Sequence, residues 1–130
     1  TTKDYQSLNA NGFAVEVNPQ DKDRMEAIYH HVEQNFQRTI PLEEIAQLIN
    51  MTVPAFCRYF KKLTNRTFTQ MVNEFRITYA SRLLRDEDMS IATISFESGF
   101  NNLSHFNKQF RAITGVSPRE YRKNLRKLVN

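Results

Sequence analysis

The strongest constraint on how this chain folds is a segment that occurs twice along it, in residues 45–71 and again in residues 94–121. The copies align with one additional residue in the second, and the matched pairs are Ile45 with Ile94, Ala46 with Ser95, Asn50 with Gly99, Phe56 with Phe106, Phe60 with Phe110, Lys61 with Arg111, Thr67 with Ser117 and Met71 with Tyr121. Each copy contains a short helical segment, a tight turn at Asn50 or Gly99, and a second helical segment with a polar or basic outer side, which is the sequence form of a helix-turn-helix. The repeat therefore predicts two helix-turn-helix units, over about 41–64 and about 90–114.

Apolar residues recur at helical spacing from residue 21 to the end, and no second strand-like alternation is present to pair with the one at Phe13–Val17. We therefore predict an all-α domain over residues 21–130, preceded by a linker remnant at residues 1–20. Its seven helices form two helix-turn-helix subdomains joined by a long linker helix at about 68–86. The other helices are predicted over about 23–36, 41–50, 52–64, 90–99, 102–114 and 117–128.

The ends of the predicted helices carry capping residues. Thr52 is a good N-cap, and Thr67 is followed three residues later by Gln70, which is a capping-box pattern. Ser117 precedes the last helix, and Gly115 ends the helix before it. The apolar residues on the inner face of the helices are expected to form the core: Met25, Ile28, Tyr29, Val32, Phe36, Leu42, Ile45, Leu48, Ile49, Phe56, Tyr59, Phe60, Leu63, Met71, Val72, Phe75, Tyr79, Leu83, Leu103, Phe106, Phe110, Ile113, Tyr121, Leu125 and Leu128.

The charge of the chain is distributed unevenly. Its net charge is +4, but residues 1–50 hold 4 Lys or Arg against 8 Asp or Glu, a balance of −4, whereas residues 51–130 hold 14 against 6, a balance of +8. A positive excess of this size favours a polyanionic partner, either nucleic acid or an anionic membrane surface.

Composition excludes several classes of protein. With 40% apolar and 25% charged residues, the chain has the composition of a globular protein and not of a disordered one. The longest apolar run has three residues, whereas a membrane-spanning helix needs about 20, so neither a membrane span nor a signal peptide is expected. The single Cys cannot form an internal disulfide, which is typical of a reducing, intracellular compartment.

No arrangement of residues indicates catalysis or metal binding. His30, His31 and His105 lack the spacing of metal ligands, and Ser104 and His105 are neighbours on one helix, where side chains diverge. We therefore expect no enzyme activity and no cofactor. Four phenylalanines at i, i+4 spacing are predicted to be core residues and not stacking platforms for single-stranded nucleic acid: Phe56, Phe60, Phe106 and Phe110.

The segment GFNNLSHFNKQFR at residues 99–111, followed by TGVSP at residues 114–118 and by Tyr121 and Arg122, resembles the C-terminal signature of AraC/XylS-type bacterial transcription regulators. The resemblance covers about residues 21–127 and extends back through Leu42, Ile45, Ala46, Phe56, Arg58, Phe60, Lys61, Arg76, Ile77, Ala80, Leu83 and Leu84. Asn50 departs from the Gly that many members have at the first turn, but Asn also accepts a left-handed backbone.

This resemblance implies seven helices in two helix-turn-helix units joined by a rigid helix. The second helix of each unit is expected to enter a major groove, both on the same side of the DNA. Members of the family usually carry a separate ligand-binding or dimerisation domain before this part. Because 130 residues leave no room for such a domain, we expect the chain to be a DNA-binding fragment.

By the same resemblance, base-edge contacts are expected from residues that flank the buried aromatic residue of each second helix: Pro54, Cys57, Arg58, Leu103, Ser104, Asn107 and Lys108. Arg58 can make a bidentate contact with guanine, Asn107 with adenine, and Lys108 can bind guanine or phosphate. The alternative is that these are solvated surface side chains, and Cys57 is equally explained as a small packing residue. Phosphate contacts are expected from side chains or helix N-termini at Thr52, Lys62, Arg66, Asn102, Ser117 and Arg119.

The predicted function is sequence-specific binding of double-stranded DNA by a bacterial transcription regulator, with two recognition helices in successive major grooves. This fragment is expected to be monomeric, cytoplasmic and nucleoid-associated, with no membrane partner, and the intact regulator is expected to act with RNA polymerase. The alternative is an all-α protein-interaction or anionic membrane-surface module that uses the basic segment Arg119–Lys127. The repeat favours DNA binding, because a lipid-binding module has no need of two turn-helix units with polar outward positions.

Overall fold

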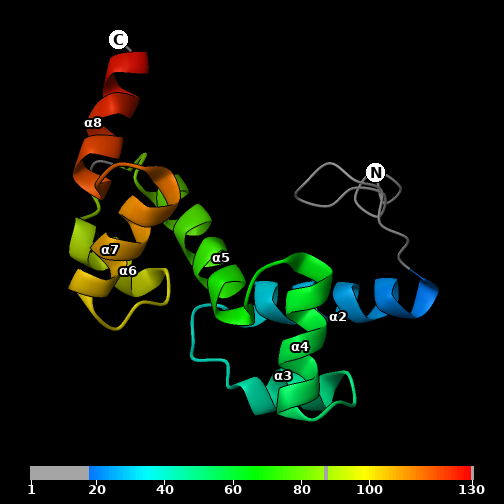
Figure 1. Cartoon of the computed structure of the whole chain (residues 1–130). Coiled ribbons are helices and arrows are strands. Elements are labelled where there is room, and N and C mark those ends of the chain that lie inside the picture. Colours follow the sequence, from blue (N-terminus) through cyan, green and yellow to red (C-terminus); the bar gives the residue numbers. More distant parts are fainter. Residues whose placement is uncertain (1–17, 87, 130) are drawn as a thin grey trace. The chain divides into compact units, whose positions relative to one another are not determined.

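The computed structural model describes residues 18–86 and 88–129 and contains seven α-helices there, without strands (Figure 1). The helices are α2 (Pro19–Asn35), α3 (Leu42–Leu48), α4 (Val53–Thr64), α5 (Phe68–Leu83), α6 (Ile91–Glu97), α7 (Leu103–Thr114) and α8 (Pro118–Val129). The all-α class and the number of helices predicted for this part of the chain are confirmed. The alternating stretch Phe13–Val17, with most of the predicted linker, lies outside the described residues.

The described residues form two compact units. Unit 1 contains the residues up to Asn35 together with Ile40–Met71, and unit 2 contains Phe36–Thr39 together with the residues from Val72 onward. The short segment Phe36–Thr39, here called the strap, thus belongs to unit 2, although the helices on both sides of it in the sequence belong to unit 1. Helix α5 begins in unit 1 and continues in unit 2.

The core of unit 1 is built around phenylalanines from α4 and α5. Phe56 and Phe60 are almost completely buried, and both meet the ring of Phe68 edge-on, at centroid distances of 5.6 and 5.9 Å. Buried aliphatic residues complete this core, from α2 (Met25, Ile28 and Val32) and from α3 and its C-cap (Ile45, Ala46 and Ile49). Each fully buried large side chain contributes about 1.5–3 kcal/mol, so these residues fix how α2, α3, α4 and the start of α5 pack in unit 1.

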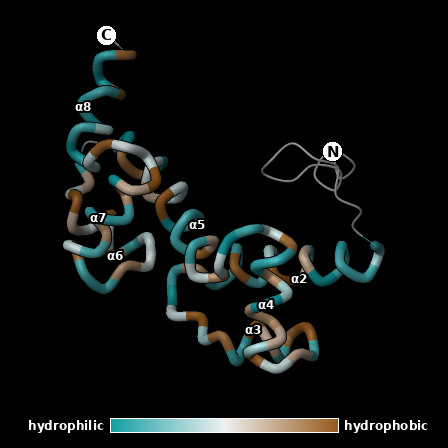
Figure 2. The backbone as a smooth tube through the Cα atoms, viewed as in Figure 1, coloured by the Kyte–Doolittle hydropathy of each residue, from teal (hydrophilic) through white to brown (hydrophobic). Residues whose placement is uncertain are grey.

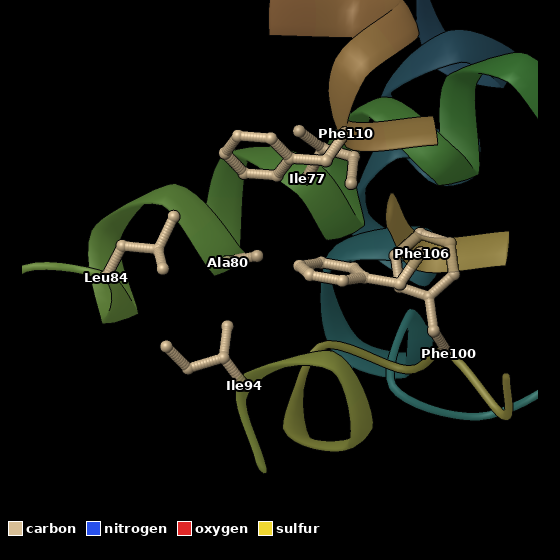
Figure 3. Packing of buried hydrophobic residues seen from close by; sticks show 7 residues of the cluster. All are labelled: Ile77, Ala80, Leu84, Ile94, Phe100, Phe106 and Phe110. Carbon is tan, nitrogen blue, oxygen red and sulfur yellow. The ribbon is translucent and has the colours of Figure 1, made fainter. Parts of the chain in front are cut away.

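The core of unit 2 repeats this construction (Figure 3). The buried cluster comprises Ile77, Ala80 and Leu84 from α5 and the residue after it, Ile94 from α6, Phe100 from the turn, and Phe106 and Phe110 from α7. Tyr121 and Leu125 of α8 pack against it, with the ring of Tyr121 edge-on to that of Phe110 at 5.4 Å. The four phenylalanines at i, i+4 spacing are therefore core residues, as predicted.

The predicted capping interactions are present. The Thr67 hydroxyl accepts a hydrogen bond from the backbone N–H of Gln70, and the Gln70 side chain accepts one from the N–H of Thr67, which completes the capping box. Ser117 accepts from the N–H of Glu120 at the start of α8. The residues at both turns, Asn50 and Gly99, have positive φ, as does Gly115 after α7.

Several helix boundaries differ from the prediction. Helix α2 begins at Pro19, four residues earlier than predicted, because Asn18 accepts from the N–H of Asp21 and proline is favoured in the first turn. Helix α5 ends at Leu83 and not at residue 86, since the Arg122 guanidinium takes up the carbonyls that follow, those of Leu84, Asp86 and Met89. Helices α3 and α6 each end two residues earlier than predicted, because the chain there enters the tight turns at Asn50 and Gly99.

Four residues expected in the core are exposed: Leu48, Leu103, Ile113 and Leu128, with exposed fractions of 42%, 45%, 41% and 83%. Leu103 is the first residue of α7 and precedes the turn in which Phe106 points inward. Leu128 lies in the last turn of α8, after Leu125, the last residue of α8 that packs against the core. The apolar stripe of each helix is therefore longer or wider than the surface that its neighbours cover.

Candidate nucleic-acid interface

Helices α4 and α7 are built from equivalent residues. Each begins at an N-cap side chain, Thr52 or Asn102, which accepts a hydrogen bond from the backbone N–H three residues later. Each ends at a left-handed residue, Asn65 with φ 61° or Gly115 with φ 89°. Two caps and two inward phenylalanines thus fix the same helix length and the same outer face in both units.

The repeat extends to the hydrogen bonds that close each helix. The hydroxyl of Thr64 donates to the carbonyl of Phe60 at 2.8 Å, and the hydroxyl of Thr114 donates to that of Phe110 at the same distance. Each hydroxyl also accepts from the backbone N–H two residues on, at Arg66 and Val116. Because these bonds define where the helix stops, the positions exposed on α4 and on α7 correspond to each other.

The seven predicted base-contact residues are all exposed, each within its own unit. Those on α4 are Pro54, Cys57 and Arg58, and those on α7 are Leu103, Ser104, Asn107 and Lys108. Neither helix contains Asp or Glu, so their outer faces are cationic without an internal counter-ion. An acid-free cationic helix face with side-chain amide, hydroxyl and guanidinium groups is suited to the major groove, where bases present donors and acceptors next to phosphates.

The predicted phosphate-contact residues have more varied surroundings. Lys62 and Arg119 are exposed, whereas Arg66 is half-buried. Thr52, Asn102 and Ser117 use their side-chain oxygens to cap α4, α7 and α8. Capping uses these oxygens as acceptors, so the hydroxyl hydrogens of Thr52 and Ser117 and the NH₂ group of Asn102 can still donate, and a phosphate oxygen accepts from such donors.

Two further exposed cations lie on these faces and are not among the predicted DNA contacts. Lys61 on α4 and Arg111 on α7 occupy matched positions of the repeat, one helical turn after Cys57 and Asn107, and both are exposed. The alignment of the two copies pairs Lys61 with Arg111. A positive charge at the same position of both copies was the signal that could have identified them. Each outer face therefore carries at least two exposed cations, Arg58, Lys61 and Lys62 on α4 and Lys108 and Arg111 on α7.

Helix α4 is also tied to the start of α2 through its inner side. The Tyr59 hydroxyl donates to Asp21 at 2.7 Å, Asp21 pairs with Arg24 at 3.6 Å, and the Arg24 guanidinium lies 5.4 Å from the centre of the Tyr59 ring. Burial, together with the hydrogen bond to the Asp21 carboxylate, raises the pKa of Tyr59 to about 12. These contacts give α4 a polar anchor in addition to its phenylalanine core.

The basic helix α8 uses most of its apolar stripe inside unit 2. Tyr121 and Leu125 pack against the core, and Arg122 binds backbone carbonyls, while Arg119, Lys123, Arg126 and Lys127 are exposed. Figure 2 shows α8 as mostly hydrophilic. Within the described residues, no helix combines the length and apolar character needed to cross a membrane. The alternative of a membrane-surface helix gains no support from this arrangement.

Comparison with known proteins agrees with the repeated architecture. The profile of a family described as "Helix-turn-helix domain" matches residues 45–124. The HTH-type transcriptional regulator YdeC of Bacillus subtilis (strain 168) is 28% identical over 122 residues, which cover 92% of this chain and 42% of that protein. The chain thus spans less than half the length of this relative.

Two solved structures share the fold. The DNA-binding domain of AdpA, a global transcriptional factor crystallised in complex with a target DNA, is 27% identical with a TM-score of 0.71, covering 80% of this chain and 93% of that one. A transcriptional regulator of Chromobacterium violaceum, described by its AraC-type DNA-binding domain, has a TM-score of 0.72 at 24% identity, covering 82% of this chain and 95% of that one. With two helix-turn-helix units and a family model that matches residues 45–124, this chain belongs to the AraC-type family of helix-turn-helix DNA-binding domains.

Proposed function

We propose that this chain recognises a two-part site in double-stranded DNA, with α4 in the major groove of one half-site and α7 in the next major groove. The observation that carries the proposal is that the same caps, core phenylalanines and closing hydrogen bonds present an acid-free cationic face twice. The DNA complex of AdpA supports it, since that domain shares the fold and 27% of its residues with this chain.

Sequence is read, in this proposal, by the exposed polar residues at the middle of each face. Arg58 of α4 donates two hydrogen bonds to guanine. On α7, Asn107 pairs with adenine and Lys108 with guanine or phosphate. Pro54, Cys57, Leu103 and Ser104 supply apolar or weakly polar contacts beside them, for example to thymine methyl groups.

Phosphate contacts then fix the register of the protein on the duplex. The proposed donors are the N-terminal N–H groups of α4, α7 and α8 with their capping residues Thr52, Asn102 and Ser117, and the cationic side chains Lys62, Arg66 and Arg119. Lys61 and Arg111, exposed on the same faces, join this set. Such contacts contribute affinity for any sequence and make binding sensitive to salt.

The test is a titration of fluorescent duplex DNA at several salt concentrations, with a duplex selected by the chain from a randomised pool and a scrambled duplex of equal length. The proposal predicts that log affinity falls linearly with log salt for both, with a steep slope from several neutralised phosphates, and that the selected duplex binds more tightly. Shallow salt dependence, or equal affinity for the two duplexes, would contradict it.

For the intact regulator, we propose that this domain acts in the bacterial cytoplasm on the nucleoid and that the longer protein works with RNA polymerase. This chain itself binds its two-part site as a monomer, because one chain supplies both recognition helices. Sedimentation of the complex with a selected duplex should then give one chain per duplex. Two chains per duplex would show that each chain reads one half-site.

A further inference from the structure

The strap contacts the rest of unit 2 through side chains that reach backbone carbonyls. Arg76 on α5 donates from Nε to the carbonyl of Phe36 at 2.7 Å and from Nη2 to the carbonyl of Arg38 at 2.9 Å. Gln37 donates from its side-chain amide to the carbonyl of Glu97, the last residue of α6, at 2.8 Å. The strap is therefore bonded to both α5 and α6.

Ring contacts hold the same region. The Phe36 ring meets the Tyr79 ring edge-on at 5.2 Å, and the Arg76 guanidinium lies 5.7 Å from the centre of the Phe100 ring. Burial lowers the pKa of Arg76, but a guanidinium stays protonated in proteins, so its charge is held in a half-buried position by carbonyl groups and an aromatic face. Phe100 is buried in the core of unit 2 and directly follows the turn residue Gly99.

Gly99 is the point at which the strap approaches the helix-turn-helix most closely. A Cβ added at residue 99 would lie 2.6 Å from the carbonyl oxygen of Phe36 and 2.9 Å from Nε of Arg76, which are the two atoms of one hydrogen bond. Gly115 also has positive φ, but a Cβ there would meet nothing within 4 Å. Gly99 is thus required both by its backbone conformation and by the strap.

We propose that Arg76 is a positioning residue for DNA recognition by α7. By holding the strap against the turn at Gly99, it fixes the orientation in which unit 2 presents α7 to its half-site. Only residues 98–102 connect α6 to α7, so the backbone of this turn sets the angle between the two helices. Arg76 itself need not contact DNA. The inference rests on the proposed function above, since it concerns the half-site that α7 reads.

The main test measures the affinity of the full chain for the selected duplex and for duplexes with base changes in one half-site at a time. Arg76→Gln removes the charge-assisted bonds to two carbonyls, and we expect the discrimination at the α7 half-site to fall about tenfold. Discrimination at the α4 half-site should stay as in the wild type, and so should the slope of log affinity against log salt, because no phosphate contact is lost.

Arg76→Lys separates geometry from charge. A lysine ammonium keeps the charge but lacks the planar fork that bridges the carbonyls of Phe36 and Arg38, so this variant should discriminate poorly at the α7 half-site as well. Full recovery by Lys, or a reduced salt slope in Arg76→Gln, would identify Arg76 as a phosphate contact and overturn the proposal. Gln37→Ala, which removes the separate bond to Glu97, should weaken discrimination at the same half-site.

A pair of glycine variants controls for stability. Gly99→Ala and Gly115→Ala both place an L-residue at positive φ, but only Gly99→Ala also displaces the hydrogen bond between Arg76 and Phe36. Gly99→Ala should lose discrimination at the α7 half-site, while Gly115→Ala should lose thermal stability without that loss. Equal effects of the two substitutions would contradict the role of the strap. If Gly99→Ala does not fold, the Arg76 and Gln37 variants still decide the question.

The two proposals fail differently. A wild-type chain that is insensitive to base changes in one half-site contradicts the two-part site, and this inference with it. A wild-type chain that reads both half-sites, beside an Arg76→Gln variant that reads both equally well, contradicts only the role assigned to Arg76.

Discussion

Arg58 and Lys108 are the exposed cations on α4 and α7 that lie nearest to the buried phenylalanines Phe56 and Phe106 in the sequence. We expect Arg58→Ala and Lys108→Ala each to weaken binding to the selected duplex by about 1 to 3 kcal/mol, because each removes a contact to a base edge. Binding to a scrambled duplex should weaken less. The check is a fluorescence titration of both duplexes, and equal losses on the two would reassign the residue to a phosphate contact.

Tyr59 should make the stability of unit 1 depend on alkaline pH. Its folded-state pKa of about 12 lies above the ordinary value of 10.0, so its neutral form is favoured in the folded state. The resulting stabilisation is complete below pH 10 and is lost as the pH rises towards 12. Tyr59→Phe should lower the free energy of unfolding by about 1 kcal/mol at pH 8, and this difference should shrink above pH 10. Urea unfolding of both proteins at several pH values measures this difference in the free energy of unfolding. A difference that does not change with pH would argue against the hydrogen bond to Asp21.

Individual residues differ in how well they could be assigned from sequence. Phe56 and Phe106 were predicted to be buried because i, i+4 spacing places them on one helix face, and a helix face is a local property. The exposure of Leu103 was not predictable in this way, since it depends on where neighbouring helices end. The bonds from Arg76 to the strap join residues about 40 positions apart, and no local pattern encodes them.

The N-cap of α7 serves two purposes in our proposals, and substitution of Asn102 can separate them. Asn102→Ala should lower stability by about 1 kcal/mol through loss of the bond from the His105 N–H. Asn102→Asp keeps an N-cap acceptor and should keep stability, but its negative charge should repel a phosphate and weaken DNA binding. Thermal unfolding and DNA titration give the two readouts.

Ser90→Asp is the matched control for this substitution. Ser90 caps α6 by accepting from the N–H of Thr93, and it is not among the proposed phosphate contacts. The substitution therefore adds the same charge at another N-cap of unit 2. An equal loss of DNA affinity in Ser90→Asp and Asn102→Asp would mean that only the net charge of the chain matters.

Helices were predictable where their signals are local. The capping box of Thr67 and Gln70 involves residues three apart, so sequence alone locates the start of α5. The start of α2 differs from the prediction because Asn18 and Pro19 fall within the predicted linker remnant of residues 1–20, whereas in the structure they form a helix start. The linker helix joins the two units as predicted, since α5 begins in unit 1 and continues in unit 2. From Val72 onward it also supplies part of the core of unit 2, which its local pattern did not indicate.

A single chain that reads two half-sites should be sensitive to the spacing between them. Inserting five base pairs between the half-sites turns one of them by about half a helical turn, since B-DNA has about 10 to 10.5 base pairs per turn. Affinity should fall to that of one half-site, and base changes in the other half-site should cease to matter. This test changes only the DNA. The core residues Ile77 and Ala80 of α5 therefore stay in place, whereas an insertion in that helix would displace them. Undiminished affinity on the lengthened duplex would indicate two units that bind independently.

The strap also determines which parts of this chain can be exchanged with a relative. Unit 2 is discontinuous in the sequence, because Phe36–Thr39 comes before most of unit 1. A hybrid protein joined at residue 72 would combine the larger part of unit 2, from Val72 onward, of one parent with the strap of the other parent. The fit between Arg76, Gly99 and the strap would then depend on two parental sequences that were not selected together. In our proposal, recombination that transfers the DNA specificity of unit 2 intact has to carry two separate stretches of sequence, Phe36–Thr39 and the residues from Val72 onward.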